Sequence, residues 1–331
     1  MILDGAAAAA IDQAARALVR GELVAFPTET VYGLGADASS DSAVARIFAA
    51  KGRPSDHPLI VHVPDASVVP RFAREVPEFA RKLMQAFWPG PLTLILPRRD
   101  GVASAAAGGQ GSIGLRCPAH PVAHALLMAC AQAQPPCLGL AAPSANQFGR
   151  VSPTTAQHVR AEFGDSLLVL DGGPCQVGIE STIVDCTRGV PVLLRPGTLT
   201  REQVQAVCGE RLRSPDEMAD HAPRASGTLE SHYAPKARVR LMDAASLQAG
   251  LDLLGDQAAG IAIYSRAILH TPSARVLRRR MPDDAVETAR QLFAVLREFD
   301  DQGVQLIWVE SPPDAPEWEG VRDRLRRAAA S

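Results

Sequence analysis

The stretch that decides the fold of this chain is Phe26-Pro27-Thr28-Glu29-Thr30-Val31-Tyr32-Gly33-Leu34-Gly35, in which a strand runs into a polar turn. Residues 22–26 have the apolar character of a buried strand. The turn that follows, 28–32, carries three hydroxyl groups and a carboxylate. A hydrophobic core favours apolar side chains, so this many polar groups at the end of a buried strand are unexpected. Departures of this kind are typical of functional sites.

A second motif, Lys51-Gly52-Arg53-Pro54, places two cations downstream of this turn. The residues before it predict a helix that Ser40 or Asp41 caps and that Gly52 ends in a left-handed conformation. Lys51 then lies at the end of that helix. The two motifs together predict a pocket for an anion.

Length and composition are those of an ordinary globular protein with room for two domains. The chain has 331 residues, of which 47% are hydrophobic and 21% are charged. Its formal net charge of -2 provides no global field for a nucleic acid, so a small-molecule partner is favoured.

The six cysteines show neither C-x-x-C spacing nor a dense framework, which favours free thiols in a reducing cytosol over structural zinc. Because acidic residues flank the N-terminal alanine run and no segment approaches the length of a membrane span, we expect a cytoplasmic protein with no membrane contact.

Helical and strand patterns alternate in two regions, which predicts an α/β fold with two domains. Residues 1–208 predict a mixed α/β catalytic domain, and 237–331 predict a smaller domain with a parallel sheet. Residues 209–236 lack periodicity and are expected to be a long linker. The expected strands are 22–26, 59–63, 92–97, 112–116, 137–142, 167–171, 181–185, 192–194, 239–242, 260–264, 275–277 and 305–309. The expected helices are 11–20, 41–51, 77–87, 120–132, 153–163 with Ser152 as its cap, a helix from about residue 200, 245–254, 285–299 and 317–329.

One familiar motif is rejected by its context. Residues 109–114 match G-x-G-x-x-G, the dinucleotide fingerprint, but they lead into a predicted strand instead of opening a helix. A Walker P-loop, a G-x-S-x-G elbow and an H-E-x-x-H motif are all absent from the sequence. The chemistry therefore has to come from another set of residues.

Polar side chains collect at the predicted ends of strands and helices. The set is Thr28, Thr30, Tyr32, Lys51, Arg53, Ser55, His62, Arg116, Ser144, Asn146, Ser152, Ser181, Thr182 and Arg195. Each has an ordinary structural explanation when taken alone; Lys51, for example, complements its helix dipole. Taken together, four cations and many hydroxyls at the strand ends of one sheet predict a shared crevice, where open α/β sheets bind ligands. An anionic substrate explains the cations.

Several segments, in this order along the chain, resemble the YrdC-like domain of the threonylcarbamoyl-AMP synthase family. They are Pro27 to Gly35, Lys51 to Pro54, Pro58 to His62, Pro143 to Asn146 and Ser181 to Asp185, and the tail motif His232-Tyr233-Ala234-Pro235 resembles the family's longer, two-domain form. The resemblance spans roughly residues 10–205 and the tail. It implies a YrdC-like mixed twisted sheet with helices, followed by a smaller Rossmann-like parallel α/β domain.

The resemblance also implies an activity, that of an L-threonylcarbamoyladenylate synthase, which is a nucleotidyltransferase. Such an enzyme forms threonylcarbamoyl-AMP and pyrophosphate from L-threonine, bicarbonate and ATP. The product serves threonylcarbamoyl-adenosine modification of tRNA and passes to a tRNA threonylcarbamoyl-transfer complex, and a weak contact with tRNA is compatible with this role. ATP is expected to arrive with Mg²⁺, for which the sequence names no protein ligand.

The family resemblance assigns roles to individual residues. Lys51 and Arg53 are the expected catalytic pair. ATP is expected to meet Lys51, Arg53, Ser55, Ser112, Ser144, Ser152, Arg195 and Tyr233. Threonine or its carbamate is expected to meet Thr28, Tyr32, His62, Arg116, Ala142 and Thr182, with Thr30, Asn146 and Ser181 lining the same pocket.

The predicted cations suit this chemistry because two anions must be brought together. The oxygen of a threonine carbamate has to attack the α-phosphorus of ATP while pyrophosphate leaves. At ~4 Å, each pair of unit charges contributes about 4 kcal/mol at an effective dielectric of 20, so clustered cations can overcome the repulsion. Positioning and electrostatics then suffice for catalysis.

Two positions leave open questions. The family commonly has Asn where this chain has His57, and an imidazole can replace the amide's hydrogen bonds but can also titrate near neutral pH. Tyr233 lies in the polar linker, where it either fills an apolar spot between the domains or closes over the nucleotide as a lid residue does. We favour closure for Tyr233.

Two other functions compete with the synthase. One is a non-catalytic module that binds tRNA or double-stranded RNA through the same basic crevice, and the near-neutral charge of the chain disfavours it. The other is a carbamoyltransferase of hydrogenase maturation. That enzyme would need acylphosphatase-like and zinc-finger segments, for which this sequence has neither paired cysteines nor room.

Overall fold

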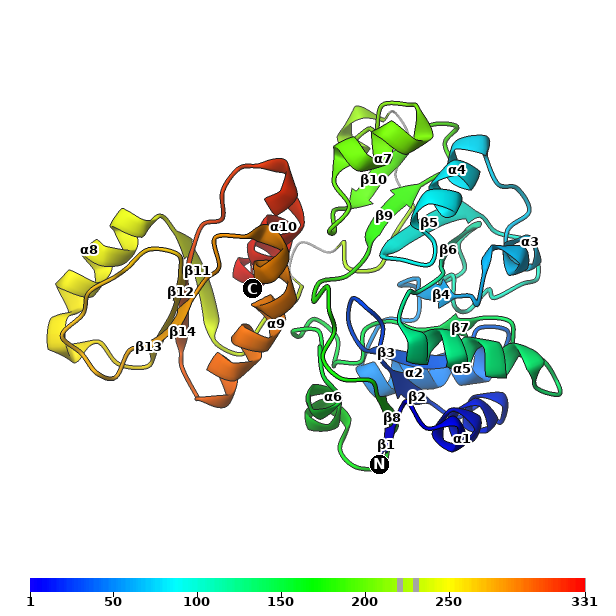
Figure 1. Ribbon diagram of the computed structural model, residues 1–331, viewed down its shortest axis with the longest axis horizontal. Coiled ribbons are helices and arrows are strands. Elements are labelled where there is room, and N and C mark those ends of the chain that lie inside the picture. Colours follow the sequence, from blue (N-terminus) through cyan, green and yellow to red (C-terminus); the bar gives the residue numbers. More distant parts are fainter. Residues whose placement is uncertain (219–222, 229–231, 331) are drawn as a thin grey trace. The chain divides into compact units, whose positions relative to one another are not determined.

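A computed structural model describes residues 1–218, 223–228 and 232–330 of the chain (Figure 1). It divides into two compact units, one of Met1–Phe148 with Ser152–Thr228 and the other of Gly149–Val151 with Leu229–Ser331. The expected linker 209–236 is divided between them: its described residues up to 228 belong to the first unit and those from 232 to the second. Residues 219–222 and 229–231 of that linker lie outside the described residues.

Within the described part of the first unit, ten strands form one mixed sheet in the order β1-β8-β2-β3-β7-β4-β6-β5-β9-β10 (Figure 1). The strands are β1 (Ile2–Asp4), β2 (Val24–Phe26), β3 (Gly33–Asp37), β4 (Ile60–His62), β5 (Leu92–Pro97), β6 (Ser112–Arg116), β7 (Leu140–Ala141), β8 (Leu168–Asp171), β9 (Thr182–Asp185) and β10 (Val192–Arg195). Parallel pairs, such as β4 with β6, occur beside antiparallel pairs, such as β5 with β6. The predicted mixed sheet is confirmed.

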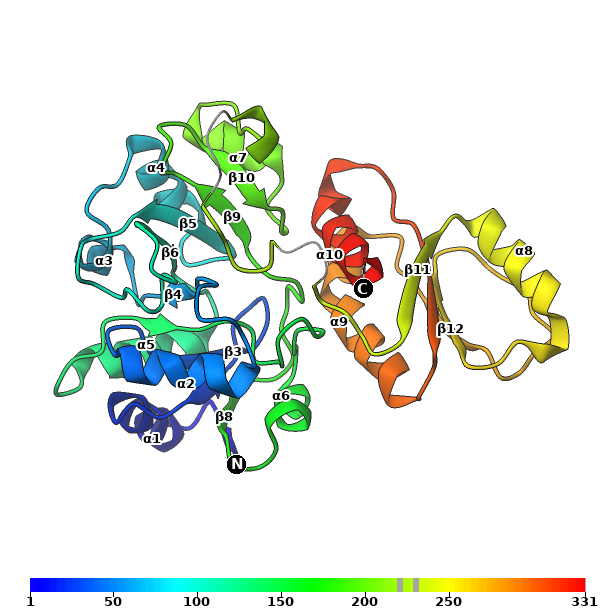
Figure 2. The same ribbon diagram turned by 180° about the vertical axis from the view of Figure 1, so that it is seen from behind.

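The helices of the first unit pack on the faces of this sheet. They are α1 (Ala8–Val19), α2 (Asp41–Lys51), α3 (Val69–Phe72), α4 (Glu78–Phe87), α5 (Pro121–Gln132), α6 (Ala156–Phe163) and α7 (Arg201–Cys208), with the short 3₁₀ helices η1 (Ala66–Val68) and η2 (Pro215–Glu217). Helix α1 packs against α5, and α4 packs against α7 (Figures 1 and 2).

Alternation along the strands sends side chains into different apolar layers. In β2, Val24 and Phe26 join a cluster with residues of α1 and α5, whereas Ala25 between them joins a larger cluster on the opposite face. The larger cluster contains side chains of α2, α3, α4 and α7, so helices cover that face of the sheet. In β4 and β6, Val61 and Leu115 belong to this larger cluster.

The opposite face of β4, β5, β9 and β10 carries a third, smaller cluster. Its strand residues include Ile60 and Ile95, and the side chains packed against them include Met218 and Ala225 from the end of the first unit. Met218 and Ala225 therefore pack on this part of the face, whereas α1 and α5 cover its other end. Two residues from Ile60, Ile95 and Ile183, and thus on the same face, lie the polar His62, Thr93 and Ser181, which belong to the candidate site.

Several local predictions for the first unit are wrong, and the structure also has β1 and α3 where no element was expected. Strand β3 was not expected, because Gly33-Leu34-Gly35-Ala36-Asp37 lacks the β-branched residues that mark strands. A Cβ on Gly35 would lie 2.8 Å from a ring carbon of Phe26 on the paired strand, so packing requires the glycine there. Ser152 does not cap a helix: α6 begins at Ala156, and Thr155 accepts the N–H of His158 as its N-cap.

The described residues of the second unit build a four-stranded parallel sheet in the order β11-β14-β12-β13. Its elements are β11 (Arg238–Met242), α8 (Ala244–Leu254), η3 (Gly255–Gln257), β12 (Ile261–Ser265), β13 (Leu277–Arg280), α9 (Ala285–Asp301), β14 (Leu306–Glu310), η4 (Pro316–Trp318) and α10 (Glu319–Ala329). The predicted parallel sheet is confirmed. The strand expected at 275–277 is instead β13, which begins at Leu277 and continues through three exposed arginines. The prediction missed these arginines because a charged run does not resemble a strand. None of the described helices is long and apolar enough to cross a membrane.

Candidate functional site

Lys51 lies at the end of α2, as the sequence predicts, and its side chain is buried. The side chain of Ser40 caps the start of this helix, and Gly52 ends it at φ 62°. The ammonium group of Lys51 donates to the carbonyl oxygen of Ser144 at 2.6 Å and to that of Asn146. Burial, and then the charge of Arg53, lower the pKa of Lys51. Two of its three N–H groups are thus held by the Pro143-to-Asn146 motif, which leaves one for a ligand.

Arg53 lies beside Lys51 and is also buried. Its Nη2 donates to the carbonyl of Pro58 at 3.0 Å and lies 3.5 Å from the hydroxyl of Ser226. The guanidinium sits over the ring of Phe148, 5.5 Å from its centroid. The ring of His57 packs edge-on against the same phenyl ring at 5.5 Å, and burial followed by the charge of Arg53 lowers the pKa of His57.

A third buried cation, Arg195, approaches the same place from β10. Its Nε and Nη2 donate to the carbonyl oxygen of Ser181 at 3.1 and 2.9 Å, and Nη2 also lies 3.1 Å from the Ser181 hydroxyl. The Ser181 hydroxyl is 2.8 Å from that of Thr93. Nη1 of Arg195 donates to the carbonyl of Ser226 at 2.8 Å. Arg53 and Arg195 therefore converge on one residue, Ser226.

A second polar group surrounds Arg116, at the end of β6. Nη1 donates to the hydroxyl of Thr30 at 2.8 Å, Nε donates to the carbonyl of Gly90 at 3.3 Å, and Nη2 lies 2.7 Å from Oε1 of Glu29. The Thr30 hydroxyl is in turn 2.9 Å from that of Thr28, which donates to the carbonyl of residue 31. The first predicted motif therefore folds around this arginine.

His62 lies next to Arg116 on the paired strand β4, and its side chain is on the same face of the sheet. Burial, and then the charge of Arg116, lower the pKa of His62 to about 3, so the imidazole is neutral at physiological pH. Its ring packs edge-on against Phe26 at 6.1 Å. Nδ1 of this neutral imidazole has no hydrogen-bond partner among the described residues and can contact a neighbouring ligand.

Tyr32 is buried, and its hydroxyl is fixed by the loop after β8. The hydroxyl donates to the carbonyl of Gly173 at 2.8 Å, lies 3.2 Å from Oδ1 of Asp171, and accepts the N–H of Gly172 at 3.2 Å. Burial is the main reason why the pKa of Tyr32 is raised. Tyr32 thus joins the first motif to this loop.

Tyr32→Phe is expected to lower the free energy of unfolding of the first unit by about 1 kcal/mol, because it removes the hydrogen bonds of the hydroxyl with half-buried groups of the loop after β8. The measurement is urea denaturation. Tyr264→Phe in the second unit is the matched control: among the described residues its buried hydroxyl has no hydrogen-bond partner, so its removal should cost little. Equal losses in the two variants would contradict this reading of Tyr32.

Residues 224–226, which we call the covering segment, lie over the crevice between Arg53 and Arg195. The amide of Gln110 pairs with the backbone of Arg224, accepting its N–H at 2.9 Å and donating to its carbonyl at 3.2 Å. A cavity of only about 10 Å³ remains beneath the segment, and Ser112 lines it. The covering segment therefore contacts both arginines through Ser226 and leaves little open space beneath it.

Some residues of the predicted set lie apart from these clusters. Ser55 is exposed, and Ala142 is buried with its N–H donated to the carbonyl of residue 60. Ser152 is buried and donates to Glu180. The hydroxyl of Thr182 donates to a carbonyl at residue 199 on the helix-covered face, away from Ser181.

Tyr233 belongs to the second unit and is buried there. Its ring stacks on Phe293 at 5.5 Å, and the guanidinium of Arg324 lies 5.2 Å from its centroid. Its φ is 62°, a left-handed conformation that is uncommon outside glycine. Within this unit, Tyr233 packs as a core aromatic residue.

Sequence reasoning missed several residues of these clusters. The sequence pattern gave Glu29 no role of its own, although a buried Arg116 requires a carboxylate partner and Glu29 lies between two threonines. Thr93 continues the alternating pattern of β5, so its parity placed it on the site face. Gln110 and Ser226 had no signal, because Gln110 contacts Arg224 and Ser226 contacts Arg53, and each contact joins segments more than a hundred residues apart.

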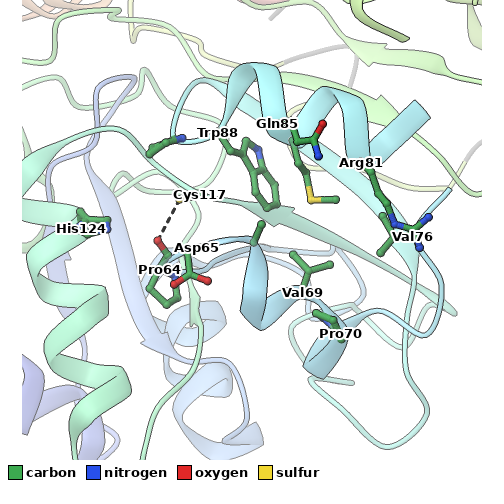
Figure 3. Close-up of a pocket in the computed structure, with 13 residues that line it drawn as sticks. Pro64, Asp65, Val69, Pro70, Val76, Arg81, Gln85, Trp88, Cys117 and His124 are labelled. Carbon is green, nitrogen blue, oxygen red and sulfur yellow. Dashed lines mark hydrogen bonds between the residues drawn. The ribbon is translucent and has the colours of Figure 1, made fainter. Parts of the chain in front are cut away.

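A larger cavity of about 490 Å³ lies between α3, α4 and α5, outside the predicted set (Figure 3). Its lining residues are Pro64, Asp65, Ala66, Val69, Pro70, Val76, Arg81, Met84, Gln85, Trp88, Pro89, Cys117 and His124. Burial raises the pKa of Cys117 to about 11, and this thiol donates to the carbonyl of Pro64 at 3.3 Å. The walls are mainly apolar, so this cavity does not suit a triphosphate.

In the described part of the chain, no three His, Cys, Asp or Glu side chains form a group that could hold a metal ion. All six cysteines are buried free thiols.

Two family models together match nearly the whole chain. One, described as "Telomere recombination" for the Sua5, YciO and YrdC proteins, matches residues 16–197, and one described as "Threonylcarbamoyl-AMP synthase, C-terminal domain" matches residues 199–330. A threonylcarbamoyl-AMP synthase of Pyrococcus abyssi is 38% identical to this chain, and the similarity covers 93% of this chain and 91% of that protein. The threonylcarbamoyl-AMP synthase of Bacillus subtilis is 39% identical, and the similarity covers 96% of this chain and 92% of that protein.

Solved structures of Pyrococcus abyssi Sua5 are similar to this chain. A variant in which a histidine and a tyrosine are replaced by alanine is 35% identical, with a TM-score of 0.89 over 99% of this chain and 96% of its own. Sua5 in complex with L-threonine is 37% identical, with a TM-score of 0.87 over 96% of this chain and 94% of its own.

Proposed function

Because the chain belongs to the threonylcarbamoyl-AMP synthase family, we propose that it joins L-threonine, bicarbonate and ATP into threonylcarbamoyl-AMP and releases pyrophosphate, for threonylcarbamoyl-adenosine modification of tRNA. One observation carries the proposal for this crevice. Three buried cations, Lys51, Arg53 and Arg195, gather at one end of a sheet whose other polar cluster, around Arg116, can hold a small anion. Two anionic reactants need such neighbouring sites.

The triphosphate is proposed to bind at the three cations as MgATP. Lys51 has one free donor position for a phosphate oxygen, and Arg53 and Arg195 present guanidinium forks that match phosphate geometry. The covering segment then has to move or share its space, since Ser226 engages both arginines. Further ATP contacts are proposed for Ser55, Ser112, Ser144 and Ser152.

Threonine and its carbamate are proposed to bind around Arg116. The guanidinium would hold the carboxylate, while Thr28 and His62 offer a hydroxyl and a neutral imidazole on the same side. Tyr32, Ala142 and Thr182 would shape the site, with Thr182 contributing through its backbone because its hydroxyl is engaged elsewhere. Thr30, Asn146 and Ser181 line the two halves.

The reaction then needs only positioning and charge stabilisation. The amine of threonine captures the one-carbon unit as a carbamate, and a carbamate oxygen attacks the α-phosphorus as pyrophosphate leaves. Lys51 and Arg53 are proposed to stabilise the charge that builds on the phosphate oxygens during this displacement. Groups of this kind typically contribute about 10²–10³ in rate each.

Tyr233 is proposed to take part in nucleotide binding by the tail. Support comes from the strained φ of this residue and from the histidine and tyrosine exchanged in the solved Sua5 variant. The product is proposed to pass to a tRNA threonylcarbamoyl-transfer complex, with at most a weak contact to tRNA. A cytoplasmic location is proposed on the basis of the free thiols.

The test is pyrophosphate release from MgATP by the purified protein, with threonine and bicarbonate each omitted in turn. Release is expected only when both are present. The competing RNA-binding module predicts binding to RNA that weakens steeply with salt, and no threonine-dependent release. Release that does not depend on threonine would overturn the proposed function.

His57→Asn is expected to retain activity within about tenfold, which corresponds to roughly 1.4 kcal/mol. The ring of His57 packs against Phe148, and its backbone carbonyl accepts from Nε of Arg53 at 3.4 Å. An asparagine preserves that backbone contact. A larger loss in the rate of pyrophosphate release would show that the imidazole has a specific role.

A further inference from the structure

Three buried polar atoms at the Arg116 cluster have no hydrogen-bond partner among the described residues. They are Oε1 of Glu29, Nδ1 of His62 and Nη2 of Arg116. The three side chains are 8%, 3% and 3% exposed. Buried polar atoms are nearly always satisfied, so three together call for an explanation, and an absent ligand is one.

The charged pair in this group is close but poorly aligned. Oε1 of Glu29 and Nη2 of Arg116 lie 2.7 Å apart, yet their directions do not make a hydrogen bond. The remaining contacts hold both side chains in place: Oε2 of Glu29 accepts the N–H of Ala119 at 3.1 Å, and Nε of Arg116 donates to Gly90. The cluster thus presents a fixed carboxylate oxygen and a fixed guanidinium N–H side by side.

An α-amino acid matches this arrangement, because its ammonium and carboxylate groups are attached to the same carbon. Its zwitterion adds no net charge to a buried ion pair, which avoids the cost of burying an uncompensated charge. We propose that Glu29 binds the ammonium group of threonine and accepts its proton when the carbamate forms. This proposal rests on the proposed function.

The proposed proton transfer balances. The ammonium gives one proton to the carboxylate of Glu29, and the free amine forms a C–N bond with bicarbonate, which loses water. The sum is threonine ammonium plus bicarbonate plus carboxylate, giving carbamate, water and the protonated Glu29. The carboxyl then loses its proton to solvent after the product leaves.

The experiment compares the affinities of threonine and 3-hydroxybutyrate, which has the carboxylate and hydroxyl but lacks the α-ammonium. By calorimetry, the wild-type protein is expected to bind threonine more tightly than 3-hydroxybutyrate, by a factor on the order of ten or more. Glu29→Gln should bind the two ligands about equally. Its side-chain oxygen can still accept the N–H of Ala119, but the negative charge that binds the ammonium is lost. Glu29→Asp keeps a carboxylate and should keep a preference for threonine. Glu78→Gln, which changes an exposed glutamate of α4, is the matched control and should behave as wild type.

The outcomes separate this role from a structural one. If Glu29 merely held Arg116, Glu29→Gln would weaken both ligands in equal proportion and the preference for threonine would survive, which would overturn the proposal. Should Glu29→Gln fail to fold, the wild-type ratio decides, since equal affinities there also overturn it. If the wild-type protein fails to bind threonine at all, the proposed function falls, and this proposal falls with it.

Discussion

Replacing Lys51 with methionine is expected to lower the rate of pyrophosphate release by on the order of a hundredfold or more while the protein stays folded. The ammonium group is buried and donates to the carbonyls of Ser144 and Asn146, so it is held in a fixed position with one donor left. Methionine fills a similar volume without the charge. The loss should appear in kcat, because the charge on the phosphate oxygens grows during the displacement.

The measurement is steady-state pyrophosphate release, with circular dichroism as the check on folding. Lys82→Met is the matched control, since Lys82 is an exposed lysine on α4. It should retain the wild-type rate. A folded Lys51→Met variant with full activity would show that the crevice described here is not the site of adenylate formation.

Arg116→Lys is expected to raise the KM for threonine by about 10-fold to 150-fold, which corresponds to about 1.5–3 kcal/mol, with little change in the KM for ATP. Lysine keeps the positive charge but cannot reproduce the fork that contacts Thr30, Gly90 and Glu29. Retaining the charge also avoids leaving Glu29 as an unpaired buried carboxylate.

Kinetics with each substrate varied in turn separate the two halves of the site. Arg81→Lys is the control, because Arg81 is exposed on α4 and its pair with Glu78 is at the surface. It should leave both KM values unchanged. If Arg116→Lys raised the KM for ATP and not that for threonine, the assignment of the two polar clusters would be reversed.

The sequence predicted elements that have strong local patterns. Strands β5 and β6 have the expected bounds, and α2 has Ser40, one of the two candidate caps, at its start and the predicted left-handed Gly52 at its end. These succeed because hydrophobic periodicity and capping chemistry are local. Strand β3 was missed because its glycines are required by packing against Phe26 on the next strand, which is a tertiary effect.

The candidate site shows the same limit. Polar residues at strand ends predicted that Lys51, Arg53 and Arg195 would gather, and Ser226 brings the two arginines together. The sequence did not reveal that the covering segment lies over these cations, since residues 209–236 have no periodic pattern. Nor did it separate Glu29 from its neighbours, because an unsatisfied Oε1 is a property of geometry and not of residue type.

The central claim is that this chain forms threonylcarbamoyl-AMP from threonine, bicarbonate and ATP. The most direct measurement is mass spectrometry of the nucleotide products after incubation with ¹³C-bicarbonate, threonine and MgATP. The account predicts a threonyl-containing adenylate that carries the ¹³C label and is lost in Lys51→Met. An adenylate without the label, or no adenylate beside hydrolysed ATP, would contradict it.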